Sequence, residues 1–187
     1  MFDIDRFVAD CRAALAEQGS EAIRDVVARA VAEPEEILRV LGTPTRASAG
    51  VAFHAPDLTI LNVAWGSHHW TLPHNHNSRA VIGMYGGRED NIFWRRLPQA
   101  DGGKIEAAGA RSLCQGDVTI LGRDIIHSVT NPLDKLSLAL HVYDRDFLIA
   151  PDRSHWDAET LTEAPYDAAR VSPMFRSEEH TSELQSQ

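Results

Sequence analysis

The sequence predicts a mainly β domain, a barrel or a sandwich, that follows a short helical segment. Its 187 residues fit one domain and can bury a core. From about residue 46 to residue 144, short apolar or alternating runs recur at roughly even spacing. Gly, Pro, Asn and Asp separate these runs, a pattern typical of all-β barrels and sandwiches. Before residue 43, apolar residues recur instead at steps of three and four, which indicates helices.

Three helices are expected at the start of the chain. The first covers residues 2–18, where one face carries an apolar stripe. Ser20 is a suitable N-cap for a second helix over residues 21–31. Pro34 suits the first turn of a third helix that ends near Leu41-Gly42.

Eight strands are expected in the middle of the chain. They are the runs VAFHA, LTILNVAW, AVIGMYGG, NIFWRRL, KIEAAGA, VTILG, HSVTN and LSLALHVY. After residue 144 the chain becomes irregular and rich in proline, and DAETL and YDAARV are candidate helical turns. We therefore expect N-terminal helices packed on a barrel, residues 1–45, and the barrel with an irregular C-terminal segment, residues 46–175.

The charge and composition of the chain limit its partners. The formal net charge of −9 argues against nucleic acid and anionic membranes. No apolar run is long enough to span a membrane, and the N-terminus lacks the apolar stretch of an export signal, so we expect a cytoplasmic protein. Cys11 and Cys114 make neither a disulfide framework nor a zinc cluster, and we expect both to be buried as small hydrophobic residues.

The last residues of the chain, 176–187, differ from the rest in composition. They are polar and show no periodicity, and residues 176–186 match the translation of a common sequencing-library adapter without a mismatch. We therefore interpret this tail as non-native and expect it to be disordered. For that reason His180 is excluded from the candidate metal ligands.

Two histidines separated by one residue raise the question of a metal site. In a strand, residues two apart point to the same face, so His74 and His76 can both face a barrel interior. His127, at the start of the run HSVTN, is the candidate for a third ligand, because a polar residue there does not suit a plain apolar core. Three neutral imidazoles would leave positions open on a bound metal.

These segments resemble the two signature motifs of the cupin superfamily. The matching residues are Gly66, His74, His76 and Gly83 for the first motif and Gly116, His127 and Asn131 for the second. The second motif departs from the usual pattern, because its proline is absent and Gly122 is displaced. The resemblance implies a double-stranded β-helix, which is a jelly-roll barrel, with the three histidines as metal ligands.

The acidic ligand that usually follows the first histidine pair is absent. Residues 77–81 contain no acid, and Glu89 is too far along to join His74 and His76 on one coordination face. A set of three histidines resembles that of the thiol dioxygenases, the group of cysteine dioxygenase and 3-mercaptopropionate dioxygenase. Bacterial members of that group also carry Ile-Gly-Met, then Gly and Glu, and this chain has Ile82-Gly83-Met84, Gly87 and Glu89 in the same register.

A relay of Ser, His and Tyr lies on a later strand of these enzymes. His141 and Tyr143 match it, whereas Ala139 stands in place of the serine. Ser137 lies two residues earlier on the same strand face and would need a change of register to replace it. The resemblance implies that Tyr143 donates a hydrogen bond to oxygen or substrate and that His141 orients Tyr143. Arg153 lies about where bacterial members carry an arginine for a substrate carboxylate.

The activity that this resemblance implies is the oxidation of a small thiol to its sulfinate by O2 on Fe(II), with Mn, Ni or Zn as alternative metals. Two other classes remain open: a cupin oxygenase or isomerase that acts on a non-thiol substrate, and a non-catalytic cupin that binds a metal or a small molecule. The expected partners are the thiol and O2, and a homodimer stays open because cupins commonly dimerise. Arg79 and Arg123 are weaker candidates than Arg153 for binding a carboxylate.

Overall fold

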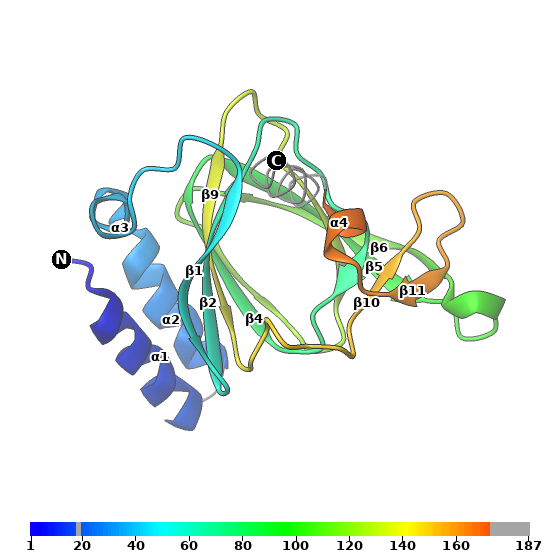
Figure 1. Cartoon of the computed structure of the whole chain (residues 1–187), viewed down its shortest axis with the longest axis horizontal. Helices are drawn as coiled ribbons and strands as arrows, with labels where there is room; N and C mark the ends of the chain where they lie inside the picture. Colours follow the sequence, from blue (N-terminus) through cyan, green and yellow to red (C-terminus); the bar gives the residue numbers. More distant parts are fainter. Residues whose placement is uncertain (18–19, 173–187) are drawn as a thin grey trace, which may run out of the picture.

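The computed structural model describes residues 1–17 and 20–172, and Figure 1 shows its course. The three predicted helices are confirmed as α1 (Ile4–Glu17), α2 (Ser20–Val31) and α3 (Pro34–Leu41). The proline of α3 stands in its first turn, where the missing N–H costs no helical hydrogen bond. The polar tail predicted at residues 176–187 lies outside the described residues, as does the side chain predicted to cap α2.

All eight predicted runs form strands, and the described residues contain three further short ones. The strands are β1 (Ser48–Ala55), β2 (Leu58–Trp65), β3 (His74–Asn75), β4 (Ala80–Gly86), β5 (Arg88–Arg96), β6 (Ile105–Cys114), β7 (Val118–Leu121), β8 (Ile126–Thr130), β9 (Ser137–Tyr143), β10 (Ser154–Trp156) and β11 (Glu163–Pro165). The run YDAARV contains the short helix α4 (Ala168–Val171). The run DAETL forms a turn, because the Asp157 carboxylate accepts hydrogen bonds from the backbone N–H groups of Glu159 and Thr160.

The strands build two antiparallel sheets that face each other (Figure 1). The first sheet has the order β1-β2-β9-β4-β7, and the second has the order β11-β10-β3-β8-β5-β6. Most neighbours within a sheet are distant in sequence, and consecutive strands often lie in opposite sheets, as in a jelly roll wound from two Greek keys. This order is that of a double-stranded β-helix, so the predicted fold class is confirmed.

The helical segment covers the outer face of the first sheet (Figure 1), where α2 packs on β4 and β7. Gly83 on β4 permits this close approach. A Cβ at that position would lie 2.4 Å from Val27 and 2.9 Å from Val31, both on α2. These two valines belong to the apolar cluster that joins the helices to the sheet. The glycine of the Ile-Gly-Met run therefore serves helix packing.

A second apolar cluster fills the barrel interior. Alternation along β4 separates the two clusters, since Val81 and Tyr85 pack toward the helices while Ile82 and Met84 pack inward. Both faces of β4 are thus buried, which explains why its sequence reads as one continuous apolar run. Polar side chains inside the barrel must therefore find partners in an apolar surrounding.

Asn131, the asparagine of the second motif, ties the loop after β8 to the end of β2. Its amide group donates hydrogen bonds to the backbone carbonyls of Trp65 (3.1 Å) and Gly66 (2.8 Å). Its oxygen accepts hydrogen bonds from the Leu133 N–H and the Ser137 hydroxyl. The residue is fully buried, and its role is to fix where β9 starts.

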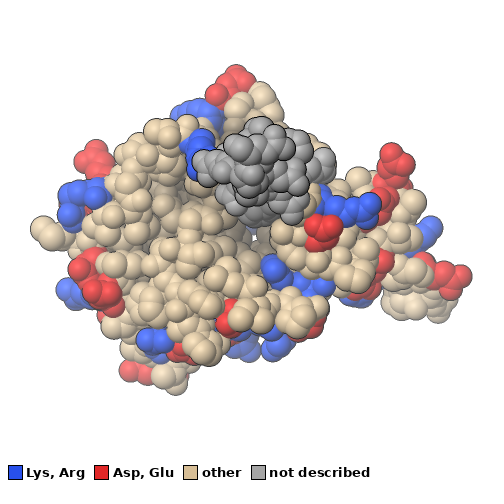
Figure 2. All heavy atoms as spheres, in the orientation of Figure 1, with Lys and Arg blue, Asp and Glu red and all other residues tan. Residues whose placement is uncertain are grey.

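The two cysteines agree only in part with the expectation that both are buried. Cys11 is buried among the helices as expected, but Cys114 is exposed. That expectation was wrong because Cys114 is the last residue of β6, an edge strand, beside a turn. Figure 2 shows basic and acidic side chains interspersed over the visible face. Among the helices that the structure describes, none has the length and apolar character needed to cross a membrane.

Candidate metal centre

Three histidines converge from the second sheet. His74 on β3 lies directly opposite His127 on β8 in an antiparallel pairing, and side chains in such positions share one face. His76 follows just after β3, and the chain turns at Asn77, whose φ is 48°. One nitrogen of each histidine lies within 4.8 Å of the others. The three-histidine cluster predicted from the sequence is therefore present.

Hydrogen bonds set the protonation of two of these rings. Nδ1 of His74 donates to the carbonyl oxygen of Leu72 at 2.9 Å, and Nδ1 of His127 donates to Oδ1 of Asn91 at 2.7 Å. With the proton on Nδ1, the Nε2 atom of each ring presents a lone pair. The Nε2 atoms of His76 and His127 are 3.2 Å apart, which suits two nitrogens bound to one ion at about 2.0–2.1 Å each.

Burial keeps the three rings neutral. It lowers the pKa of His74 to about 4. Burial and the mutual repulsion of the rings hold the pKa values of His76 and His127 well below their ordinary range. Neutral imidazole is the form that binds metals. The donor set of three neutral nitrogens therefore fits a divalent transition-metal ion, and it includes no carboxylate from the described residues.

A small cavity of about 60 Å³ opens beside the cluster. Its polar lining consists of Thr71, His74, His76, His127, His141, Tyr143, Tyr166 and Ser172, and its apolar lining consists of Ala49, Leu61, Val63, Trp65, Val129, Phe147 and Val171. Apolar walls with a few convergent polar groups are typical of small-molecule sites. The volume favours a small ligand.

His141 and Tyr143 lie two residues apart on β9 and both line this cavity. Nδ1 of His141 is 3.1 Å from the Tyr143 hydroxyl. The Tyr143 ring stacks on Phe147 at 3.7 Å between centroids and meets His76 edge-on at 5.2 Å. Burial lowers the pKa of His141 to about 3 and raises the pKa of Tyr143 above its ordinary value. A protonated phenol therefore lies beside the histidine cluster near neutral pH.

The serine position of the relay is filled by an apolar side chain. Ala139 is fully buried in the barrel cluster. Ser137 does not replace the serine, because its hydroxyl oxygen lies 2.6 Å from the Arg88 carbonyl and 2.9 Å from Asn131 Oδ1, and these acceptors use its single proton. Nε2 of His141 is buried and has no hydrogen-bond partner among the described residues.

Glu89 enters the barrel from β5, on the opposite sheet, and is fully buried. Its Oε2 accepts a hydrogen bond from the Trp65 indole N–H at 2.7 Å, and its Oε1 accepts one from the Asn91 amide at 2.9 Å. Oε2 also lies 4.0 Å from Nε2 of His141. Burial raises the pKa of Glu89, against the lowering effect of its two hydrogen bonds. As predicted, Glu89 lies outside the three-histidine group.

Arg153 is not among the residues that line this cavity; it lines a separate surface pocket with Asp152 and Ser154, and it packs against two rings of the cavity wall from behind. Its guanidinium carbon is 3.8 Å from the centroid of the Tyr166 ring and 4.2 Å from that of Phe147, and both rings line the cavity. Its Nη1 is buried and has no hydrogen-bond partner among the described residues. Aromatic faces thus hold a guanidinium that keeps an unused donor. Arg79 and Arg123, the weaker candidates, are exposed.

The other described histidines lie outside the cluster. His54 and His68 pair with aspartates at 2.8 Å and 2.6 Å. His69 is buried and stacks on a tryptophan ring. His155 on β10 lies on the far side of β3, directly opposite His74 in the sheet, and its Nδ1 has no hydrogen-bond partner among the described residues.

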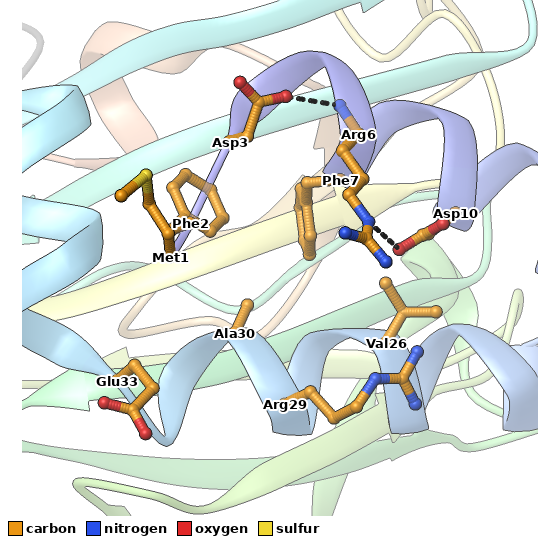
Figure 3. Close-up of a pocket in the computed structure, with 10 residues that line it drawn as sticks. All are labelled: Met1, Phe2, Asp3, Arg6, Phe7, Asp10, Val26, Arg29, Ala30 and Glu33. Atoms are coloured by element: carbon orange, nitrogen blue, oxygen red, sulfur yellow. Dashed lines mark hydrogen bonds and ion pairs between the residues drawn. The ribbon is translucent and has the colours of Figure 1, made fainter.

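A separate hollow of about 200 Å³ lies between α1 and α2, outside the barrel (Figure 3). Phe2, Phe7 and Val26 form its apolar part, while the side chains at its edge carry both signs of charge. Its ten described lining residues include no histidine or cysteine. The chemistry-bearing residues therefore gather in the barrel cavity and not in this hollow.

The contacts that two polar side chains make behind the cluster were not predicted. Glu89 and Asn91 are two residues apart on β5, so they face the same way, and both are buried. A pair of polar residues at alternate positions in a strand, with one of them an acid, is the signal that was available. Phe147 and Tyr166 were missed as well, because both lie in the irregular region after β9.

Comparison with known proteins yields structural likeness only. No protein-family model and no curated protein sequence matches this chain. Oxalate decarboxylase from Bacillus subtilis, solved at pH 4.6, matches with 15% identity over 54% of this chain and 24% of its own chain, at a TM-score of 0.42. A structure of that enzyme from a study of its Mn(II) centres matches with 16% identity over 49% of this chain and 22% of its own, at a TM-score of 0.39.

An uncharacterized conserved protein with a double-stranded β-helix domain from Klebsiella pneumoniae matches with 11% identity over 56% of this chain and 76% of its own, at a TM-score of 0.41. This chain spans about a quarter of the length of the oxalate decarboxylase that it matches. Because the TM-scores are low, the fold class rests on the strand order of this chain. That order makes the protein a double-stranded β-helix, and a buried three-histidine cluster lies inside it.

Proposed function

We propose that this protein is an Fe(II)-dependent cupin that oxidises a small thiol to its sulfinate with O2. The observation that carries the proposal is the cluster of three neutral histidine nitrogens, without a carboxylate, at a small buried cavity. The sequence resemblance to thiol dioxygenases supports the choice of chemistry. In the overall reaction a thiolate and O2 give a sulfinate that keeps both oxygen atoms, so the sulfur supplies all the electrons and no outside reductant is needed.

The residues that would hold the metal are His74, His76 and His127. When bound, Fe(II) supplies an undiminished positive charge that favours the thiolate over the thiol, and it supplies open positions for thiolate and O2. The chain contributes the fixed rings, since hydrogen bonds to Leu72 and Asn91 hold two of them with Nε2 unprotonated. Mn, Ni or Zn fit the same donor set, so metal identity is part of the proposal.

The residues in and next to the cavity have distinct roles in this proposal. Tyr143 keeps its proton beside the cluster and donates a hydrogen bond to the reacting oxygen or sulfur, and His141 holds its hydroxyl in place. Arg153, with a buried donor that has no other described partner, pairs with a substrate carboxylate. The apolar walls exclude water from the site.

The test begins with metal-free protein loaded with Fe(II) under anaerobic conditions. O2 uptake is then measured with cysteine, 3-mercaptopropionate, cysteamine and mercaptosuccinate, and the product is identified by mass spectrometry. The proposal predicts uptake matched by sulfinate formation for at least one thiol. Stoichiometric iron without uptake for any of them would contradict it.

The alternatives give different outcomes in the same experiment. A cupin oxygenase or isomerase on a non-thiol substrate would bind the metal and ignore every thiol, and the alanine in place of the relay serine is the observation that favours it. Zinc already bound in the purified protein, together with no O2 uptake, would support a non-catalytic binding protein. For variants of the cluster histidines, the matched control is His68→Ala, since the exposed His68 pairs with Asp134 away from the cavity.

A further inference from the structure

We propose that Glu89 is a positioning residue that supports two histidines at once, His127 of the cluster and His141 beside Tyr143. Its carboxyl group lies where the two supporting networks meet, between β5 and β9. The proposal deepens the proposed function and rests on it for its catalytic meaning. Its tests measure metal affinity and histidine protonation, and neither requires the protein to turn over a substrate. The tests therefore remain valid if the protein fails to oxidise any thiol.

The first network runs from Glu89 through Asn91 to His127. Oε1 of Glu89 accepts a hydrogen bond from the Asn91 amide nitrogen at 2.9 Å. This contact orients the amide, so that its oxygen faces Nδ1 of His127 at 2.7 Å. The Nδ1 atom must then carry the proton, which leaves the Nε2 lone pair for the cluster. Without Glu89, the Asn91 amide could reverse and favour the wrong form of the ring.

The second network runs from Glu89 to His141. Oε2 of Glu89 lies 4.0 Å from Nε2 of His141, and both side chains are almost wholly buried. This distance is too long for a hydrogen bond, and no described residue gives the nitrogen one. The Glu89 carboxyl therefore acts on His141 through its charge and not through a hydrogen bond; in this proposal it sets which nitrogen carries the proton, and hence how Nδ1 meets the Tyr143 hydroxyl at 3.1 Å.

The side chains at neighbouring positions on β9 cannot set which nitrogen of His141 carries the proton. Ala139 shares the strand face of His141 and has no hydroxyl. Ser137 is engaged with Arg88 and Asn131. Trp65 donates its indole N–H to Oε2 of Glu89 at 2.7 Å, which helps to hold the carboxyl in place.

The experiment compares the whole protein with Glu89→Gln by two measurements. Zinc affinity is determined by competition with a chromophoric chelator, and histidine ring protonation is read by 15N NMR on the metal-free protein. The substitution keeps the size of the side chain but replaces one of its two acceptor oxygens with an NH2 donor. We expect zinc affinity to fall by about 10- to 100-fold and His141 to change from one tautomer to a mixture of both.

Matched variants separate the two networks. Asn91→Ala should weaken zinc binding and leave the His141 tautomer unchanged. The double variant Glu89→Gln with Ala139→Ser places a hydroxyl beside His141 on the same strand face, so it should restore a single tautomer without restoring zinc affinity. Glu106→Gln removes an exposed carboxylate that pairs with Arg95, and it should change neither measurement.

Three results would overturn the proposal. They are an unchanged zinc affinity in Glu89→Gln, an unchanged His141 tautomer in the same variant, and a wild-type His127 that carries its proton on Nε2. If Glu89→Gln does not fold, Glu89→Asp is used instead, because it shortens the side chain and keeps the carboxyl group. It should show a smaller fall in zinc affinity and a smaller change in the His141 tautomer. The His127 tautomer of the wild-type protein decides the first network in either case.

Discussion

His74 on β3 lies directly opposite His127 on β8, and this one register brings together two segments about fifty residues apart in sequence. β3 has only two residues, so its position depends on its neighbours β8 and β10. The pairing makes both rings face the barrel interior. A shift of β3 by one residue would turn His74 away from the cluster.

The substitution His127→Ala should abolish stoichiometric metal binding. His127 supplies a nitrogen to the cluster, and its Nε2 is 3.2 Å from that of His76. Two remaining imidazoles hold a divalent ion far more weakly than three. Elemental mass spectrometry of the protein after loading with Fe(II) or Zn(II) measures the metal content and checks this prediction. Retained stoichiometric metal would show that another residue is the third ligand, and His68→Ala should behave as wild type.

The substitution Tyr143→Phe should slow turnover of the iron-loaded protein by at least about tenfold. The change removes one hydroxyl and leaves the ring stacked on Phe147, so the fold and the metal content should not change. Initial rates of O2 uptake at equal iron content measure the effect. Tyr85→Phe is the control, because the Tyr85 hydroxyl bonds Asn62 outside the cavity. Equal rates for Tyr143→Phe and wild type would remove Tyr143 from the mechanism.

The substitution Arg153→Met should raise the KM of thiols that carry a carboxylate. Loss of a buried charge-assisted contact costs about 1.5–3 kcal/mol, which corresponds to roughly 10- to 100-fold in affinity. Cysteamine, which has no carboxylate, should show no such rise. Comparing the KM for 3-mercaptopropionate and cysteamine in both proteins checks this, with Arg95→Met as an exposed control. A parallel rise for both thiols would mean that Arg153 only supports the rings of Phe147 and Tyr166.

The elements and the cluster could be predicted because each depends on local pattern. Apolar spacing gave the three helices and the eight long strands, and the His-x-His spacing placed two rings on one face. His127 needed the resemblance of a second motif. In contrast, β3, β10 and β11 have two or three residues each, which is too short for a periodic signal.

The supporting residues of the site could not be predicted because they depend on which strands face each other. Glu89 matches the family motif and lies just before the predicted run NIFWRRL, but only the closing of the barrel places it near His141. The role of Asn91 depends on the register of β5 with β8, which places it opposite Val129 and within hydrogen-bond distance of His127. Cys114 was misjudged for the same reason, since exposure at an edge strand depends on sheet order.

The metal-free protein should lose stability as the pH falls below about 6.5. Burial lowers the pKa values of His69 and His74 to about 4 and of His141 to about 3, so these rings stay neutral in the folded state. The unfolded chain binds a proton at each of them near pH 6.5, so it holds more protons than the folded chain between that pH and the folded pKa values. The free energy of unfolding must therefore decrease through this window, by about 1.4 kcal/mol per pH unit for each excess proton.

Among the residues that the structure describes, one buried acid opposes this trend. The pKa of Glu89 is raised, so its protonation favours the folded state as the pH falls, but several histidines act in the other direction. Urea unfolding followed by circular dichroism, at pH values from 7.5 to 4.5, gives the midpoint as a function of pH. The exposed variant His68→Ala should reproduce the wild-type curve, whereas His69→Gln should flatten it, because one depressed histidine is removed. A midpoint that stays constant between pH 7 and pH 5 would mean that the histidines are solvated in solution and that the barrel interior is more open than its packing indicates.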